Sequence, residues 1–239
     1  FKNLCKTYPN GFASVKDFSL EVADGSLVTL YGPHGCGKST ILKLLTGVLT
    51  PSDGSIRADG NEIHGITGHF AYMPQNDLLF PWKTILDNVC LYGEIHGSLA
   101  RAREEALKNF PAFGLTGYEN SYPSALSGGM RQRAAFLRTA LCQADILLLD
   151  EPFGALDVIT RSEMQDWLLA MRARLNRTVL LVTHDMDEAI YLSDRILILN
   201  PAPAGIVSEI RIDEKKRDRN WLYEQGELRK TISQKIKGF

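Results

Sequence analysis

A glycine-rich segment between an apolar run and a helical run constrains this chain most strongly. The apolar run is Leu27–Tyr31, the helical run is 41–45, and the residues between them read GPHGCGKST. Glycines let such a backbone curl so that successive N–H groups point inward, and a following helix adds partial positive charge at its N-terminus. Strand, loop and helix in this order predict a phosphate-binding loop in an α/β fold.

The side chains of this loop predict a nucleotide site. Lys38 can reach the outer phosphates, and the Ser39 hydroxyl can ligate Mg²⁺. We assign the whole loop to nucleotide binding: Gly32, Pro33, His34, Gly35, Cys36, Gly37, Lys38, Ser39 and Thr40. The alternative is a glycine-rich turn without a ligand, but a chance match in a chain of this length is roughly a one-in-a-hundred event.

Short apolar runs and amphipathic helices alternate along much of the chain. We expect strands at 18–22, 27–31, 55–58, 70–73, 146–149, 179–182, 196–199 and 206–210, and helices at 100–110, 131–141, 157–175 and 185–192. This alternation predicts a parallel sheet covered on both faces. Residues 1–75 and 144–210 would form the α/β core, and 76–143 a helical insertion. Residues 211–239 hold nine Lys or Arg against five Asp or Glu, and we expect a mobile charged tail or a small partner-facing helix there.

Composition excludes several classes of protein. The chain has 239 residues, of which 44% are hydrophobic and 23% charged, as in ordinary globular domains rather than disordered or collagen-like chains. The net charge of -1 lacks the basic excess of a duplex-binding domain, and no apolar run approaches the ~18 residues that cross a bilayer. The four cysteines form no CxxC pair, which favours free thiols in a reducing cytosol.

Two acidic residues follow the apolar run 146–149. A carboxylate at the carboxyl end of such a strand faces the crevice in which α/β sheets bind ligands. We expect Asp150 to hold Mg²⁺ and Glu151 to polarise a water in line with the γ-phosphate. Acidic residues after a strand are commonly only solvated loop charges, and it is the phosphate loop that favours the functional interpretation.

The segment LSGGMRQR, residues 126–133, precedes a helix. Ser127 can act simply as an N-cap, with the two glycines as loop. A serine and two glycines at a helix start also build an anion site that no side chain obstructs. Because the chain already has a phosphate loop, we expect Ser127, Gly128 and Gly129 to serve the nucleotide of a neighbouring subunit.

Residues 126–133 resemble the signature motif of the ATPases of ABC transporters, usually LSGGQ, with Met130 in place of glutamine. Further motifs of that family follow in order over roughly residues 1–210: Tyr8, Gln75, Asp150, Glu151, the segment 154–157 that ends at Asp157, and His184. The resemblance implies that Tyr8 stacks on adenine and that Asp157 lies by the nucleotide. It implies that Asp150 and Gln75 bind magnesium with Ser39. It also implies that Glu151 is the catalytic carboxylate, acting with His184 and Gln75.

Within this family, segments 75–82, 130–133, 151–157 and 183–189 look most like the nitrate/sulfonate/taurine importer branch. The resemblance implies a P-loop NTPase (RecA-like) core with an antiparallel β subdomain and an inserted α-helical subdomain. It implies an ATP-hydrolysing importer subunit, peripheral at the cytoplasmic face of the cell membrane, for a small anion or related solute. Two copies, forming a homodimer, would close head to tail around two Mg-ATP.

The resemblance also implies the other partners. Transmembrane permease subunits would contact residues 75–82, an extracytoplasmic solute-binding protein would act indirectly, and nucleic acid is not expected. Phe80 and Trp82 could form a groove for a permease helix, or could be packing at the start of a helix capped by Thr84.

Three rival functions stay open at this point. An ABC-type ATPase could power a soluble assembly or DNA-maintenance complex, although such proteins often carry long coiled-coil insertions or basic surfaces. A P-loop kinase would need an acceptor pocket, and residues 126–133 would have no role in such an enzyme. A nucleotide-sensing module is disfavoured by Glu151 and His184 together. His184 precedes Asp185, which can cap a helix with Glu188, whereas His34, His64, His69 and His96 have no motif of their own.

Overall fold

A six-stranded sheet forms the centre of the part of the chain that the computed structural model describes, residues 1–214 and 216–237. Its spatial order is β11-β10-β3-β9-β8-β7. The strands are β3 (Leu27–Tyr31), β7 (Phe70–Met73), β8 (Ile146–Asp150), β9 (Thr178–Thr183), β10 (Arg195–Leu199) and β11 (Ile206–Arg211). Neighbouring strands are parallel except β10 and β11, which pair antiparallel at one edge. Parallel strands need cover on both faces, and β3 and β9 are accordingly buried throughout.

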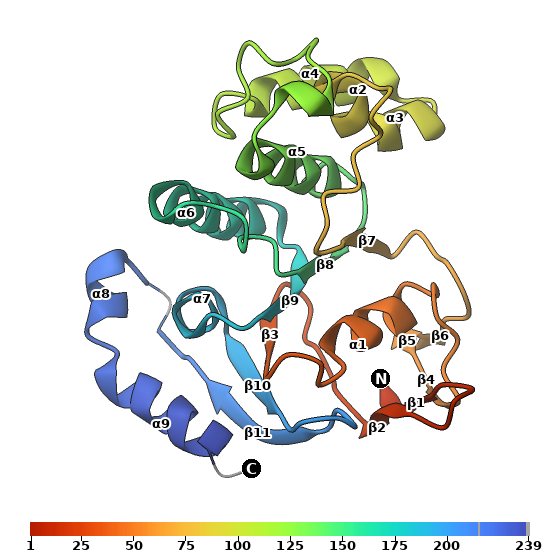
Figure 1. Ribbon diagram of the computed structural model, residues 1–239, viewed down its shortest axis with the longest axis vertical. Helices are drawn as coiled ribbons and strands as arrows, with labels where there is room; N and C mark the ends of the chain where they lie inside the picture. The colour runs from red at the N-terminus through yellow and green to blue at the C-terminus, as the bar shows by residue number, and fades with distance from the viewer. Residues whose placement is uncertain (215, 238–239) are drawn as a thin grey trace.

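Alternate side chains of this sheet enter two apolar clusters, one on each face. Leu148 and Leu180 belong to the cluster that contains α1 (Lys38–Leu45). Leu149 and Leu181 belong to the other, which α5 (Gly128–Ala140), α6 (Val158–Leu175) and α7 (Met186–Leu192) cover. The expected α/β fold with a doubly covered parallel sheet is therefore present (Figure 1).

A small antiparallel sheet of order β2-β1-β4 lies beside α1. It consists of β1 (Lys2–Thr7), β2 (Ala13–Phe18) and β4 (Asp53–Ser55), and a hairpin of β5 (Arg57–Ala58) and β6 (Asn61–Glu62) follows. The prediction of a strand at 18–22 is wrong, because β2 ends at Phe18. Leu20 is nevertheless buried and its N–H bonds the carbonyl of Phe1, so an inward-packed loop imitates the alternation of a strand.

Helices dominate residues 85–140, as expected for the insertion. They are α2 (Ile85–Val89), α3 (Leu91–Ile95), α4 (Leu99–Asn109) and α5, with a short 3₁₀ turn at Pro123–Ala125. Phe113 and Phe136 pack edge-on against Trp167 of α6, at centroid distances of 4.6 and 5.6 Å. Figure 1 shows these helices stacked above α6, at the end of the molecule away from β10 and β11.

The last part of the chain forms helices that pack on the core, so the expectation of a mobile tail is wrong, whereas the alternative of a partner-facing helix stays a prediction. It contains α8 (Arg219–Tyr223) and α9 (Gly226–Lys237), beside α7 and β10. Leu222 is 5% exposed and Ile232 is fully buried. The Arg219 guanidinium lies 4.0 Å from the centre of the Tyr191 ring on α7. The charged composition therefore describes only the outer surface of these helices.

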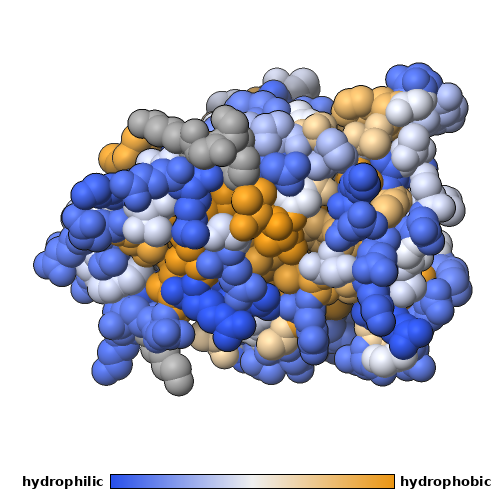
Figure 2. All heavy atoms as spheres, turned by 90° about the horizontal axis from the view of Figure 1, so that it is seen from below, coloured by the Kyte–Doolittle hydropathy of each residue, from blue (hydrophilic) through white to orange (hydrophobic). Residues whose placement is uncertain are grey.

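Figure 2 views the side of the molecule on which α9, β10 and β11 lie. Apolar atoms gather in the middle of that face and hydrophilic side chains surround them. Val207 of the edge strand β11 is 48% exposed. Among the described residues, no helix combines the length and the apolar character that a bilayer span requires.

Candidate nucleotide site

The glycine-rich loop joins β3 to α1, as the sequence predicts. Gly37 has φ of 110°, which L side chains rarely adopt. A Cβ at this position would lie 2.5 Å from the carbonyl oxygen of Ser14 on β2, so only glycine fits. No side chain caps α1, and its first N–H groups are left for a ligand to bind.

Lys38 lies folded over the same loop. The side chain is 5% exposed, and its ammonium donates to the carbonyls of Gly32 at 2.8 Å and Pro33 at 2.7 Å. Thr40 and Ser14 share a hydroxyl hydrogen bond of 3.0 Å that ties the loop to the antiparallel sheet. A buried cation among inward-facing backbone groups is a site for phosphate anions.

Asp150 ends β8 and is 3% exposed. Burial raises the pKa of this carboxyl, while a hydrogen bond from Ser39 opposes that rise. The Tyr72 hydroxyl also donates to it at 3.4 Å. Two expected magnesium ligands, Ser39 and Asp150, therefore meet at the carboxyl edge of the sheet. Hydroxyl and carboxylate oxygens are the donors that Mg²⁺ prefers, so these residues fit that ion.

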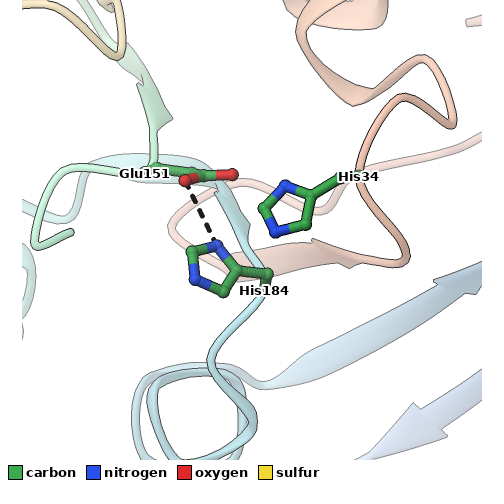
Figure 3. Close-up of side chains that lie close together, drawn as sticks. All are labelled: His34, Glu151 and His184. Atoms are coloured by element: carbon green, nitrogen blue, oxygen red, sulfur yellow. Dashed lines mark ion pairs between the residues drawn. The ribbon is translucent and has the colours of Figure 1, made fainter.

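Glu151 stands at the centre of a convergent group of side chains (Figure 3). Its backbone is left-handed, with φ of 49°, and its N–H bonds the Val182 carbonyl at 2.9 Å. The amide of Gln75 donates to the Glu151 carboxylate at 3.2 Å, and Nδ1 of His184 lies 3.2 Å from the same oxygen. The structure thus brings together Gln75, Glu151 and His184, the residues expected to act in catalysis.

His34 joins this group from the phosphate loop. Its ring centre is 4.8 Å from that of His184, and Figure 3 shows the ring directed toward Glu151 and His184. Sequence reasoning placed His34 in the loop but gave it no role at the catalytic carboxylate. The sequence did indicate this position, because His34 comes three residues after the end of β3, at the same sheet edge as the ends of β8 and β9.

Tyr8 lies in the turn between β1 and β2. Its ring stacks on Phe12 with centroids 6.4 Å apart, and the Lys6 ammonium lies 5.7 Å from the ring centre. Phe12 is 49% exposed. Tyr8 itself is half-buried, so one ring of the pair is open to solvent. Such an aromatic pair, on the subdomain bonded to the phosphate loop, is suited to stacking on a planar base.

Ser127, Gly128 and Gly129 lie apart from the phosphate loop. Ser127 caps α5 by accepting the Met130 N–H at 3.3 Å, and it is exposed with Gly128. A Cβ on Gly129 would lie 3.5 Å from the Ala155 carbonyl, so the segment borders the loop that ends at Asp157. Asp157 in turn caps α6 through the Ile159 and Thr160 N–H groups. Among the described residues, no hydrogen bond joins 127–129 to 32–40.

The segment 75–82 is fastened to α5 by two arginines that the sequence analysis did not single out. Arg131 pairs with Asp77 at 3.1 Å, and Arg138 donates to the carbonyls of Asp77 and Leu78 at 2.7 and 2.9 Å. The two arginines are seven residues apart, which places them on one face of α5, and this spacing could have indicated a shared partner segment. Trp82 is 70% exposed and its ring lies 5.1 Å from that of Phe80.

A buried acid, Glu188, lies behind His184. The Thr183 hydroxyl donates to it at 2.6 Å, and burial raises its pKa to about 7. Asp185 caps α7 as expected, through the N–H groups of Asp187 and Glu188. The Glu188 side chain does not return to the Asp185 N–H, which instead bonds Thr183, so the reciprocal half of the capping box is absent.

Comparison with known proteins decides the family. The sequence pattern that defines the ABC transporter family matches residues 15–154. This chain belongs to the ABC transporter family. Its resemblance to that family, inferred from the motifs, is therefore confirmed, as is the expectation of a P-loop ATPase that binds ATP.

Two relatives and one solved structure illustrate the match. The formylaminopyrimidine import ATP-binding protein ThiZ of Halalkalibacterium halodurans is 40% identical over 236 residues, covering 98% of this chain and 92% of its own. The taurine import ATP-binding protein TauB of Yersinia pestis is 39% identical, covering 91% and 84%. The dimeric structure of MJ0796, a bacterial ABC transporter cassette, superposes with a TM-score of 0.80 at 28% identity, covering 89% and 98%.

Proposed function

We propose that this chain is the ATP-hydrolysing subunit of an ABC importer, in which two copies close head to tail around two Mg-ATP. The observation that carries the proposal is the convergence of Gln75 and His184 on Glu151 at the carboxyl edge of the sheet. A carboxylate held by these groups beside the phosphate loop can orient a water for attack on the γ-phosphate. Relatives named as import ATP-binding proteins support the importer role.

Each group at the site has a task in this mechanism. Lys38 and the N–H groups of the loop stabilise the phosphate charge, and Tyr8 stacks on the adenine. Ser39, Asp150 and the Gln75 side-chain oxygen would hold Mg²⁺, which would supply positive charge against the phosphate oxygens. Glu151 acts as the general base toward water, and His184 holds its carboxylate and contacts the γ-phosphate.

The separation of Ser127–Gly129 from the phosphate loop supports a shared site. These exposed backbone N–H groups at the start of α5 bind phosphate only if another chain supplies it. Val158 and Ile159, just after Asp157, are 77% and 73% exposed. Two large apolar side chains in this position suit a surface that a second copy covers. The dimeric ABC cassette of similar fold supports the same arrangement.

Movement at the nucleotide would reach the membrane partner through residues 75–82. Gln75 contacts Glu151, while Asp77 and Leu78 are bound to α5 by Arg131 and Arg138. Exposed Trp82 and Leu78 offer an apolar surface to a helix of a permease subunit at the cytoplasmic face of the membrane. We infer from the taurine import relative that the solute is a small anion or related compound, bound by an extracytoplasmic protein.

A subunit-mixing experiment tests the shared site. Lys38→Ala removes the phosphate-loop cation, and Gly128→Asp places a negative charge against the γ-phosphate of the other chain. A Cβ on Gly128 meets only an Arg131 nitrogen at 3.9 Å, and Asp is favourable at a helix start, so this variant should fold. Each variant alone should be inactive, whereas randomly mixed subunits regain activity at roughly a quarter of the wild-type sites.

Two controls accompany the mixture. Gly128→Ala adds the Cβ without the charge and should keep most of the ATPase activity. Glu151→Gln should bind ATP and hold a stable dimer while turnover is nearly abolished. Absence of any regained activity in the mixture, with both variants folded and able to dimerise, would contradict the shared site.

A further inference from the structure

His34, Glu151 and His184 form a group of metal-ligand type at the carboxyl edge of the sheet (Figure 3). One ligand atom from each lies within 4.8 Å of the other two. The carboxylate oxygen of Glu151 and Nδ1 of His184 are 3.2 Å apart. Around a tetrahedral zinc ion, neighbouring ligand atoms are about 3.4 Å apart, so this pair already has the required spacing.

The third ligand, from His34, must come closer to the other two, because the three ligand atoms are brought only within 4.8 Å of one another. His34 is exposed, and among the described residues no hydrogen bond restrains its ring. Rotation of this side chain can bring a ring nitrogen closer to the other two ligand atoms. His184 is also exposed, while the Glu151 side chain is 13% exposed, so solvent reaches the group and can supply a fourth ligand.

The donor set discriminates between metal ions. Two imidazoles and one carboxylate suit zinc, whereas magnesium prefers oxygen ligands and octahedral geometry. The proposed magnesium ligands are Ser39, Asp150 and Gln75, and none of them belongs to this group. We propose that His34, Glu151 and His184 form a separate Zn²⁺ site, and that bound Zn²⁺ withdraws the Glu151 carboxylate from the water it would activate.

Zn²⁺ binding is independent of hydrolysis, but the inhibitory consequence rests on the catalytic role proposed for Glu151. The primary experiment therefore uses the nucleotide-free full chain without Mg²⁺. Zn²⁺ is titrated in competition with a chromophoric chelator, and we expect one saturable site. Loss of a residue that merely supports a ligand costs about 10–100-fold in metal affinity, so His34→Ala, Glu151→Gln and His184→Ala should each weaken binding at least about tenfold.

His64→Ala is the matched control. His64 also faces a carboxylate, at 3.8 Å from Glu62, and its side chain is 81% exposed, but the described residues offer it no third ligand. This variant should bind Zn²⁺ as the wild type does. Circular dichroism checks that every variant is folded, and three independent substitutions keep the test valid if one of them is not.

Co²⁺ identifies the ligands by absorption. Nitrogen and oxygen ligation gives visible d–d bands without a thiolate charge-transfer band in the ultraviolet. A thiolate band, unaltered Zn²⁺ affinity in His34→Ala, or the absence of a saturable site would each overturn the proposal. If Zn²⁺ binds as expected but does not inhibit ATP hydrolysis, the metal site stands and its effect on Glu151 is overturned. The turnover of Glu151→Gln then shows separately whether Glu151 is catalytic.

Discussion

Glu151, the expected catalytic residue, follows directly after β8 and has a left-handed backbone, so the chain turns away from the strand at this residue. A left-handed conformation at a residue other than glycine costs about 1–3 kcal/mol and persists only where surrounding contacts hold it. Here the Glu151 N–H bonds Val182, and the carboxylate is held by Gln75 and His184. Asp150, one residue earlier, continues β8 and is buried. Adjacent acids therefore face different surroundings, which suits one to a metal ion and the other to water.

Glu188 provides a residue-scale prediction on pH and stability. Its pKa is about 7 in the folded chain, mainly because of burial, against 4.5 for an ordinary glutamate. Thr183 and Arg161 favour its charged form, and Asp185 opposes it. The folded chain therefore binds the Glu188 proton more tightly than the unfolded chain does. The free energy of unfolding contributed by this difference is fully present below pH 4.5 and is lost as pH rises through about 7.

Glu188→Gln should therefore stabilise the protein at high pH. Above pH 7 we expect a gain of about 3 kcal/mol over the wild type, and below pH 4.5 no difference. Urea unfolding of both proteins at a series of pH values measures this. A stability difference that does not change with pH would contradict the raised pKa.

At the scale of elements, Asn88 organises the turn that carries Phe80 and Trp82. The side chain is fully buried on α2. Its amide donates to the carbonyls of Phe80, Lys83 and Thr84 at 3.0–3.1 Å, and its oxygen accepts the Phe80 N–H at 2.7 Å. Thr84 caps α2 as the sequence predicts. Phe80 can therefore pack at the start of α2 while Trp82 offers a surface to a partner, because the turn is held by Asn88 and Trp82 is exposed.

Asn88→Asp should loosen this turn. The variant keeps the shape of the side chain but replaces its donor with a carboxylate facing three carbonyls. We expect a loss of about 3 kcal/mol in urea unfolding and faster tryptic cleavage after Lys83. Asn61→Asp, the same substitution on exposed β6, should change neither measurement. Equal cleavage of both variants would show that Asn88 does not hold the turn.

At the scale of the whole molecule, the C-terminal helices close one face of the core. Arg217 donates to the carbonyls of Ser193 at 2.6 Å and Ile212 at 3.1 Å, linking the end of α7 to the segment after β11. Arg229 of α9 pairs with Asp187 of α7 at 2.7 Å. Ile232 belongs to the same apolar cluster as Leu181 of the central sheet.

Ile232→Ala tests whether α9 contributes to global stability. Truncation of a fully buried isoleucine should cost about 3 kcal/mol in urea unfolding. Tyr223→Ala, at a side chain that is 74% exposed, should stay within about 0.5 kcal/mol of the wild type. Equal and negligible effects would mean that α9 is detached from the core in solution.

The sequence predicted those features of the fold and site whose residues lie close together along the chain. The phosphate loop is recognisable because a strand, glycines and a helix start are consecutive in the chain. Ser127, Asp157 and Asp185 are caps whose partners lie within three residues. The strand at 18–22 was mistaken because burial of Leu20 in a loop gives the same alternation. At the C-terminus the charged composition left a mobile tail and a small helix as alternatives. Leu228, Ile232 and Ile236 recur every four residues, and this spacing indicates the buried face of α9.

By itself, then, the sequence determined the nucleotide loop, the alternation of strands and helices, and the family. Tertiary structure alone decided that His34 faces Glu151 and His184, that Arg131 and Arg138 hold the segment 75–82, and that the charged C-terminal segment covers the core. The physical reason is that caps and loops are stabilised by neighbours along the chain. Contacts between residues far apart exist only after the sheet has aligned the ends of its strands.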